Sequence, residues 1–182
     1  MKIRLNNVRL AFPALFEAKT VNGEGKPTFS ARFILSPDHP GVKAVNEAIE
    51  AVAKAKWGDK AELTLKTLRA QLKVCLHNGD EKPEYDGFPG NMFVSASNQA
   101  RPTVIDRDRT DLIAADGRPY AGCYVNAVVE IWAQDNNFGK RVNASLSGVQ
   151  FLRDGDAFTG GQPASADEFD DMSEGADADS LI

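Results

Sequence analysis

Residues 120–152 constrain the fold of this chain more than any other stretch, because they read as two long strands joined by a tight turn. Between residues 120 and 135 apolar and polar side chains alternate, as in a strand with one buried face. The predicted core face carries five small or branched apolar side chains, Cys123, Val125, Ala127, Val129 and Ile131. Residues 136–139 (Asn-Asn-Phe-Gly) suit a hairpin turn, and residues 140–152 form the predicted return strand. A long antiparallel hairpin is therefore expected at the centre of the fold.

Two more strands are predicted near the N-terminus, and the parity of their apolar residues slips within the first. In residues 3–12, Ile3 and Leu5 share one parity, whereas Val8, Leu10 and Phe12 share the other. A bulge near Asn6 and Asn7 would reconcile the two sets. Residues 28–36 alternate cleanly after a Gly-rich loop over residues 22–27. In the later hairpin the parity shifts again at Gly148, and strands that bend in this way favour a small closed barrel over a flat sheet.

A helical insertion is predicted after the second strand. Apolar residues recur at helical spacing over residues 42–52, with Asp38 as the expected N-cap and Gly58 as the stop. A second helical pattern runs over residues 65–72. Residues 77–91 read as a loop, residues 92–98 as a strand and residues 101–119 as an irregular charged segment. The expected architecture is mainly β: a five- to six-stranded antiparallel barrel with a helical insertion after the second strand.

The charge of the sequence is divided unevenly. Residues 154–182 contain nine Asp or Glu and no Lys or Arg, whereas the first 153 residues hold all 21 basic residues against 17 acidic ones, a formal net charge of +4. The acidic segment has too few apolar side chains to fold alone. We therefore expect a folded domain over residues 1–153 and a flexible acidic tail over residues 154–182. A polyanion tethered to a positive surface competes for the anion that the surface binds, and nucleic acid is the expected anion.

Several other classes of protein are disfavoured. No apolar run approaches the roughly 20 residues that span a bilayer, and the N-terminal residues lack a signal-peptide pattern, so we expect no contact with a membrane. Cys75 and Cys123 stand singly and far apart, which indicates two buried, reduced thiols of a cytosolic protein.

Cations and aromatic residues together predict a surface for single-stranded nucleic acid. Such a surface needs cations for the phosphates and exposed rings for the bases, and stacking is worth ~1–3 kcal/mol per base. By parity, Tyr124 and Trp132 lie on the non-core face of the long strand, and Arg32 lies on the non-core face of its own strand. The remaining candidate cations belong to the charged segment and to the start of the last strand: Arg101, Arg107, Arg109, Arg118, Lys140 and Arg141.

Two alternatives stay open for these residues. The two rings could pack under the inserted helices, since large rings are mostly buried. The arginines could pair with Asp106, Asp108 and Asp111 of the same segment.

Catalysis has little support in the sequence. Residues 106–111 interleave three Asp with two Arg, so a metal-dependent nuclease there is a rival hypothesis only. Asp154-Gly155-Asp156 begins like a calcium loop, but its twelfth position is Ser165 in place of Glu. His39 and His77 have no acid or nucleophile motif near them. We expect no enzyme activity, no metal and no cofactor; a second rival is a protein-interaction module whose acidic tail mimics DNA.

Three blocks of the sequence resemble a known family. They are residues 8–17 (VRLAFPALFE) with 29–35 (FSARFIL), residues 101–107 (RPTVIDR), and residues 120–127 (YAGCYVNA), followed by residues 148–150 (GVQ) and the acidic end. Together they resemble the single-stranded DNA-binding proteins of tailed bacteriophages, a group long catalogued as a domain of unknown function. Periodicity alone does not separate the oligonucleotide-binding (OB) barrel from other small barrels, but the resemblance implies it. It also implies a protein of the host-cell cytoplasm that coats single-stranded DNA during phage replication or recombination.

The resulting hypothesis is a barrel groove that binds single-stranded DNA without strong sequence preference. The predicted DNA-binding residues are Arg32, Arg101, Arg107, Arg109, Tyr124, Trp132, Lys140 and Arg141. The tail is expected to occupy the same groove in the free protein and to contact phage or host replication and recombination proteins. The tail residues predicted to do so are Asp167, Glu168, Phe169, Asp170, Asp171, Asp177, Asp179, Leu181 and Ile182. Several tails of this type end on an aromatic residue, so the end at Leu181-Ile182 leaves the docking partner open; a homodimer is also left open.

Overall fold

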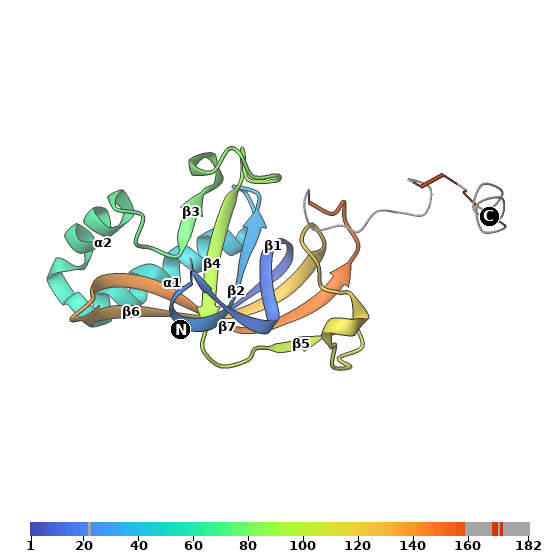
Figure 1. Ribbon diagram of the computed structural model, residues 1–182. Coiled ribbons are helices and arrows are strands. Elements are labelled where there is room, and N and C mark those ends of the chain that lie inside the picture. Colours follow the sequence, from blue (N-terminus) through green and yellow to red (C-terminus); the bar gives the residue numbers. More distant parts are fainter. Residues whose placement is uncertain (22, 159–168, 171, 173–182) are drawn as a thin grey trace.

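The computed structural model describes residues 1–21, 23–158, 169, 170 and 172, and a sheet curled into a barrel is its central element (Figure 1). Its strands are β1 (Lys2–Val21), β2 (Glu24–Leu35), β3 (Leu76–Asn78), β4 (Met92–Asn98), β5 (Thr103–Ile105), β6 (Tyr124–Asn136) and β7 (Gly139–Arg153). Its helices are α1 (Pro40–Trp57) and α2 (Ala61–Ala70), and short 3₁₀ turns cover Gly58–Lys60, Gly79–Glu81 and Ala114–Asp116.

Five of the strands close the barrel. They follow the order β4–β2–β1–β6–β7, and β7 returns to β4 where Ser145 pairs in parallel with Ser97. The short strands β3 and β5 extend this sheet, β3 antiparallel to β4 and β5 parallel to β7. Three consecutive antiparallel barrel strands followed by a hairpin that returns to the first strand give the OB order. The predicted OB barrel with helices after its second strand is confirmed; the two parallel pairings and the short strands at the edges are additions.

The barrel core consists of the residues that the alternation predicted. The five core-face residues of residues 120–135 are each at most 1% exposed. Along β7 the buried residues are Val142, Ala144 and Leu146, and then Val149 and Phe151. The register between β6 and β7 shifts between Val128 and Val129, which confirms the bulge at Gly148. The bulge near Asn6 and Asn7 is confirmed too, since the β1–β6 register shifts between Leu5 and Val8.

Phe12 departs from its predicted parity. Val8 and Leu10 are buried as expected, but Phe12 is 49% exposed. The β1–β2 register shifts between Ala11 and Ala14, and Phe12 has a φ of 48°, in the left-handed region. Pro13 has no N–H to donate to a ladder, so the strand bulges here and turns the phenyl ring outward. Beyond this bulge β1 continues to Val21, well past its predicted end.

Helix α1 packs against β1 and β6 through Val45, Ala48, Ile49 and Ala53. Its N-cap is His39 and not Asp38: the His39 Nδ1 accepts the Gly41 N–H at 2.8 Å, and Pro40 occupies the first helical position. The helix ends at Gly58 (φ 56°) as predicted. None of the helices in the described part of the chain is long and apolar enough to cross a membrane.

Residues 79–91 fold over the outside of the barrel and make a second, smaller core. Phe88 of this loop packs with Ala11, Ile34 and Phe93, and Tyr85 and Phe158 cover them. The loop closes on Gly79, whose N–H donates to the Asn91 carbonyl at 2.7 Å. This loop therefore places Tyr85 on the outer face of the sheet.

The two cysteines are free and buried, as predicted. Burial raises the pKa of the Cys75 thiol to about 12 and that of Cys123 to about 11, so both stay protonated at neutral pH.

Candidate nucleic-acid interface

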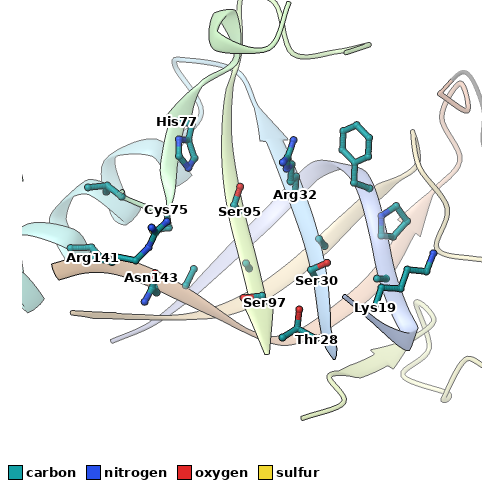
Figure 2. A pocket seen from close by; sticks show the side chains of 18 of the residues that line it. Lys19, Thr28, Ser30, Arg32, Cys75, His77, Ser95, Ser97, Arg141 and Asn143 are labelled. Carbon is teal, nitrogen blue, oxygen red and sulfur yellow. The ribbon is translucent and has the colours of Figure 1, made fainter. Parts of the chain in front are cut away.

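A groove of about 680 Å³ crosses the outer face of β1, β2 and β4 and reaches the start of β7. Hydroxyl side chains cover its floor: Thr28 and Ser30 on β2, and Ser95 and Ser97 on β4 (Figure 2). Three cations line it, with Arg32 on β2, Lys19 on β1 and Arg141 on β7 (Figure 2). Among the described residues that line the groove there is no Asp or Glu, so its net charge is positive.

Arg32 is surrounded by aromatic rings. Its guanidinium carbon lies 5.1 Å from the ring centroid of Phe12, 5.9 Å from that of Tyr85 and 5.6 Å from that of Phe93. Phe12 and Tyr85 meet edge to face, with their centroids 4.7 Å apart. These cation–π contacts hold the charged group in place without neutralising it. The bulge at Phe12 and the loop over residues 79–91 thus bring rings to a cation that sits between them.

His77 lines the same groove. Its ring stacks on Phe93 at a centroid distance of 4.9 Å, and its Nδ1 lies 3.5 Å from a carboxylate oxygen of Glu81. Burial lowers the pKa of His77, and the nearby charges of Arg32 and Arg141 lower it further, whereas Glu81 opposes the shift. His77 is therefore neutral at neutral pH and becomes a further groove cation only in acid.

The β6–β7 hairpin forms the far end of the groove. Arg141 and Asn143 of β7 line it, and Trp132 of β6 lies opposite Asn143 in the register. The indole of Trp132 is 41% exposed and donates its N–H to the Ser145 hydroxyl at 3.0 Å. Trp132 and Arg141 therefore lie on neighbouring strands of the hairpin, offset by two residues in the register.

The family model described as "Enterobacter phage Enc34, ssDNA-binding protein" matches residues 1–181. The chain belongs to this family. A curated relative, protein p50 of the Acyrthosiphon pisum secondary endosymbiont phage 1, is 52% identical over 176 residues, which are 95% of each chain.

Solved structures agree with this membership. The Enc34 single-stranded DNA-binding protein in complex with ssDNA has a TM-score of 0.75 at 27% identity, over 86% of this chain and 88% of that one. The C-terminal truncation of the same Enc34 protein has a TM-score of 0.73 at 28% identity, over 86% of this chain and 88% of that one. The gp2.5 protein of bacteriophage T7 shares the fold, with a TM-score of 0.56 at 12% identity over 93% of this chain and 97% of that one. The resemblance to phage single-stranded DNA-binding proteins and the expectation of a binding protein in place of an enzyme are thereby confirmed.

Within this Enc34 family fold, the eight predicted DNA-binding residues fall into separate places. Arg32 and Arg141 line the groove, and Lys140 and Trp132 lie beside it on the hairpin. Arg109 lines a different hollow. The other three, Arg101, Arg107 and Tyr124, lie outside the groove lining.

Tyr124 is the first residue of β6, eight positions before Trp132. The guanidinium carbon of Arg153 lies 3.7 Å from its ring centroid, and that of Arg9 lies 5.6 Å away on the same ring. The Tyr124 ring therefore already has two protein cations within 6 Å of its centroid. Neither Tyr124 nor Trp132 is buried under the inserted helices.

The acidic residues of the charged segment, as described, do not form a metal-binding cluster. The carboxylate of Asp106 accepts a hydrogen bond from Arg118 at 2.6 Å, which holds the pKa of Asp106 below its usual range. The carboxylate of Asp108 accepts the hydroxyl of Thr110, which lowers its pKa as well. No group of three His, Cys, Asp or Glu residues in the described ranges is placed to hold a metal ion. The rival nuclease site thus lacks a ligand set there.

Sequence reasoning missed Phe12, Lys19, His77 and Tyr85, all of which line the groove. A signal existed for Phe12, because Pro13 follows it within a strand pattern. Tyr85 lies in a segment read only as a loop, and nothing in its spacing shows that the loop folds back on the sheet.

Most of the predicted tail residues lie outside the described residues: Asp167, Glu168, Asp171, Asp177, Asp179, Leu181 and Ile182. Phe169 and Asp170 are described and exposed. The beginning of the acidic segment packs on the barrel. Arg9 donates to the Asp156 carbonyl at 2.7 Å, and its guanidinium carbon lies 4.4 Å from the ring centroid of Phe158.

Proposed function

We propose that this protein binds single-stranded DNA, without strong sequence preference, in the groove across β1, β2 and β4. The observation that carries the proposal is the groove itself: cations and exposed rings meet on the face of the second and third barrel strands, where OB folds bind oligonucleotides. Membership of a family of phage ssDNA-binding proteins supports the same ligand.

The side chains divide the work by their chemistry. Lys19, Arg32 and Arg141 neutralise phosphates along the groove. Phe12, Tyr85 and Trp132 offer faces on which bases stack, which any base can do. The hydroxyls on β2 and β4 hydrogen-bond to the backbone or to base edges. Binding of this kind is tolerant of sequence, as coating of an unpaired strand requires.

The role of the other predicted cations follows from their positions. Lys140 precedes Arg141 in β7, and successive side chains of a strand point to opposite faces, so Lys140 adds to the positive field beside the groove without lining it. Arg101 and Arg107 are exposed outside the groove and add only to its long-range positive field.

The acidic tail competes for this groove in the free protein. Phe158 lies close to the groove, because its ring packs against Gly87 and Ile34 in the same small core that Tyr85 covers. Tyr85 in turn lines the groove. Residues 159–182 have a maximal extended span of roughly 80 Å, which is long enough to reach the groove from Phe158. This proposal divides the chain into a binding domain (1–153) and an acidic tail (154–182), whose residues 154–158 pack on the barrel. The tail is also the segment that recruits replication or recombination proteins.

As a phage DNA-binding protein, the chain would act in the host cytoplasm, during replication or recombination of phage DNA. Whether it does so as a homodimer is decided by its mass in solution.

The test is a gel shift or anisotropy titration that compares single-stranded and duplex oligonucleotides. Arg32→Ala with Arg141→Ala should abolish tight binding of oligo-dT, while the control Lys43→Ala with Lys54→Ala, which removes the same charge from α1, should retain it. Deleting residues 160–182 should tighten binding and reduce discrimination against duplex.

Different results point to different rivals. A chain without residues 160–182 that fails to bind oligo-dT at low salt favours the protein-interaction module and overturns the proposal. Cleavage of DNA with magnesium or manganese, lost in Asp106→Asn, would favour the nuclease. Unchanged affinity after the deletion at low salt would refute the competing tail alone.

A further inference from the structure

A second positively charged hollow lies on another part of the barrel. It has a volume of about 520 Å³, and its cations are Lys2 and Arg4 of β1 and Arg109 of the turn after β5. Its lining and the groove lining share no residue. We call it the β6 hollow, because Asn126 and Val128 of β6 form part of its floor.

The topology places the β6 hollow across the barrel from the groove. In the closed order β4–β2–β1–β6–β7, β6 is the strand that pairs with neither β2 nor β4. The groove is built on β2 and β4, whereas the hollow is built on the first residues of β1, on β6, on the second half of β7 and on β5. One short oligonucleotide therefore cannot fill both.

The cations of the β6 hollow are free of acidic partners. None of Lys2, Arg4 and Arg109 forms an ion pair within the described residues. Three of the nearby acids have other partners: Glu130, opposite Lys2 in the β1–β6 register, lies 3.3 Å from the N-terminal ammonium, Asp106 is bound by Arg118, and Asp108 accepts the Thr110 hydroxyl. Among the described lining residues there is again no Asp or Glu.

Arg109 is held in place by its turn. The Arg109 N–H donates to the Asp106 carbonyl at 2.9 Å, and its φ is 70° in the left-handed region, which a non-glycine residue seldom adopts. Gln150 donates to the Arg107 carbonyl at 3.3 Å and accepts the Asn126 amide at 3.2 Å. The turn is thereby tied to the floor of the hollow, and backbone strain at Arg109 is sustained by these bonds.

The chemistry of the β6 hollow differs from that of the groove in one respect. The described residues of its lining include cations and amide side chains (Asn6, Asn126, Gln150) but no aromatic residue. Cations and amides bind phosphate oxygens, whereas bases need rings on which to stack. We propose that the β6 hollow is a second nucleic-acid site, which holds the phosphodiester backbone of another segment of DNA and leaves its bases unstacked.

This inference rests on the proposed function, since both sites take the same class of ligand. Its consequence is that one protein chain holds two segments of DNA at once, one by bases and backbone and one by backbone alone. If three cations contact phosphates, the logarithm of affinity at the hollow falls with a slope of about −2 in the logarithm of salt. A rise from 50 to 200 mM salt would then weaken this binding about 20-fold.

The test is a titration of the full-length protein with oligo-dT of about eight nucleotides, and with an abasic chain of the same length. The wild type should bind two oligo-dT per chain at low salt and one in moderate salt. Because each site has three cations, the wild type should also bind two abasic chains at low salt. The variant Lys2→Ala, Arg4→Ala, Arg109→Ala should bind one oligo-dT and one abasic chain at low salt. The control Lys43→Ala, Lys54→Ala, Lys56→Ala removes three cations from α1 and should behave as the wild type.

The groove variant Arg32→Ala, Arg141→Ala separates the two proposals, because it should keep abasic binding while losing the tight oligo-dT event. One oligo-dT per wild-type chain at low salt, or a second event that survives in the hollow variant, overturns the second site and leaves the groove intact. A further outcome also overturns the second site: a peptide of residues 160–182 binds the wild type and not the hollow variant, while abasic binding is equal in both. That result would assign the β6 hollow to an acidic tail. No binding of either oligonucleotide overturns both proposals.

Discussion

Replacing Arg32 by alanine tests the groove most directly. Arg32 lies within 6 Å of three ring centroids and has no acidic partner among the described residues, so its charge is available to a phosphate. A net hydrogen bond to a charged group is worth about 1.5–3 kcal/mol, which corresponds to a roughly 10- to 150-fold loss of affinity. Backbone pairing of residue 32 with Ser95 and Ala11 is unaffected, so the barrel should remain folded.

Salt dependence gives the second readout. Three groove cations predict a slope of about −2.1 for a single strand, and removing one changes it to about −1.4. Both chains should lack residues 160–182, so that the tail does not compete; a truncated Enc34 relative has been solved as a folded protein. Fluorescence anisotropy with labelled oligo-dT at several salt concentrations measures affinity and slope together.

The matched control is Arg32→Lys. Lysine keeps the charge but not the planar group that fits between the rings, so the slope should stay at about −2.1 while affinity falls by less than in the alanine variant. An alanine variant with an unchanged slope and an affinity within about twofold of the parent chain would refute the assignment of Arg32 to phosphate.

Four further predictions concern His77, Trp132 and Gly79. Burial and the charges of Arg32 and Arg141 lower the pKa of His77, so His77 is neutral at pH 7 and gains a proton below pH 6.5. Bound phosphates favour the protonated ring, so DNA affinity should rise as pH falls from 7 to 5. In anisotropy titrations, His77→Gln should flatten this pH profile. The effect of pH on folding stability without DNA has the opposite sign. Between the lowered pKa of His77 and pH 6.5, the folded state binds fewer protons than the unfolded state, so His77 should reduce stability as pH falls through that window. Urea unfolding of the wild type and of His77→Gln at several pH values measures this loss. In a Trp57→Phe background, oligo-dT should quench the remaining Trp132 fluorescence, since Trp132 is exposed beside Asn143; emission that is unchanged at saturation would remove Trp132 from the interface. A Cβ on Gly79 would lie well inside 3.0 Å of the Phe88 carbonyl, so Gly79→Ala should destabilise the fold by ~1–3 kcal/mol in urea unfolding and displace Tyr85. The control is Gly90→Ala, because a Cβ there meets open space. It should cost only the ~1–2 kcal/mol of placing alanine in a left-handed backbone conformation.

Much of the barrel could be predicted because its strands obey a period of two over long stretches. The core face of β6 and the parity shift at Gly148 were readable, since a buried face demands apolar residues at every second position. The stop of α1 at Gly58 was equally local. The N-cap was misplaced by one residue because an Asp and a His stand side by side before Pro40, and both can accept a backbone N–H.

The candidate site was less predictable, because a groove depends on which outer faces adjoin one another in space. Arg32 and Arg141 were assigned by parity and loop position, and they meet in one groove through the closure of β7 on β4. Parity also placed Tyr124 and Trp132 on one face, but two residues eight positions apart on a strand are separated by roughly 27 Å, and only Trp132 adjoins the groove. Long-range folding of residues 79–91 over the sheet left no periodic trace, so Tyr85 could not be found.

The strand irregularities connect the closure of this barrel with its binding surfaces. A closed barrel needs strands that coil and bend, and the irregularities of β1 and β7 include bulges at Asn6-Asn7, at Phe12-Pro13 and near Gly148. Each bulge also redirects side chains to the outer face beside a hollow. Phe12 enters the groove, whereas Asn6 and Gly148 line the β6 hollow. Restoring regular pairing at one bulge should therefore alter binding at the adjoining site, the groove or the β6 hollow, and leave the other site unchanged. This pattern is expected because the same backbone features close the barrel and position its two charged surfaces.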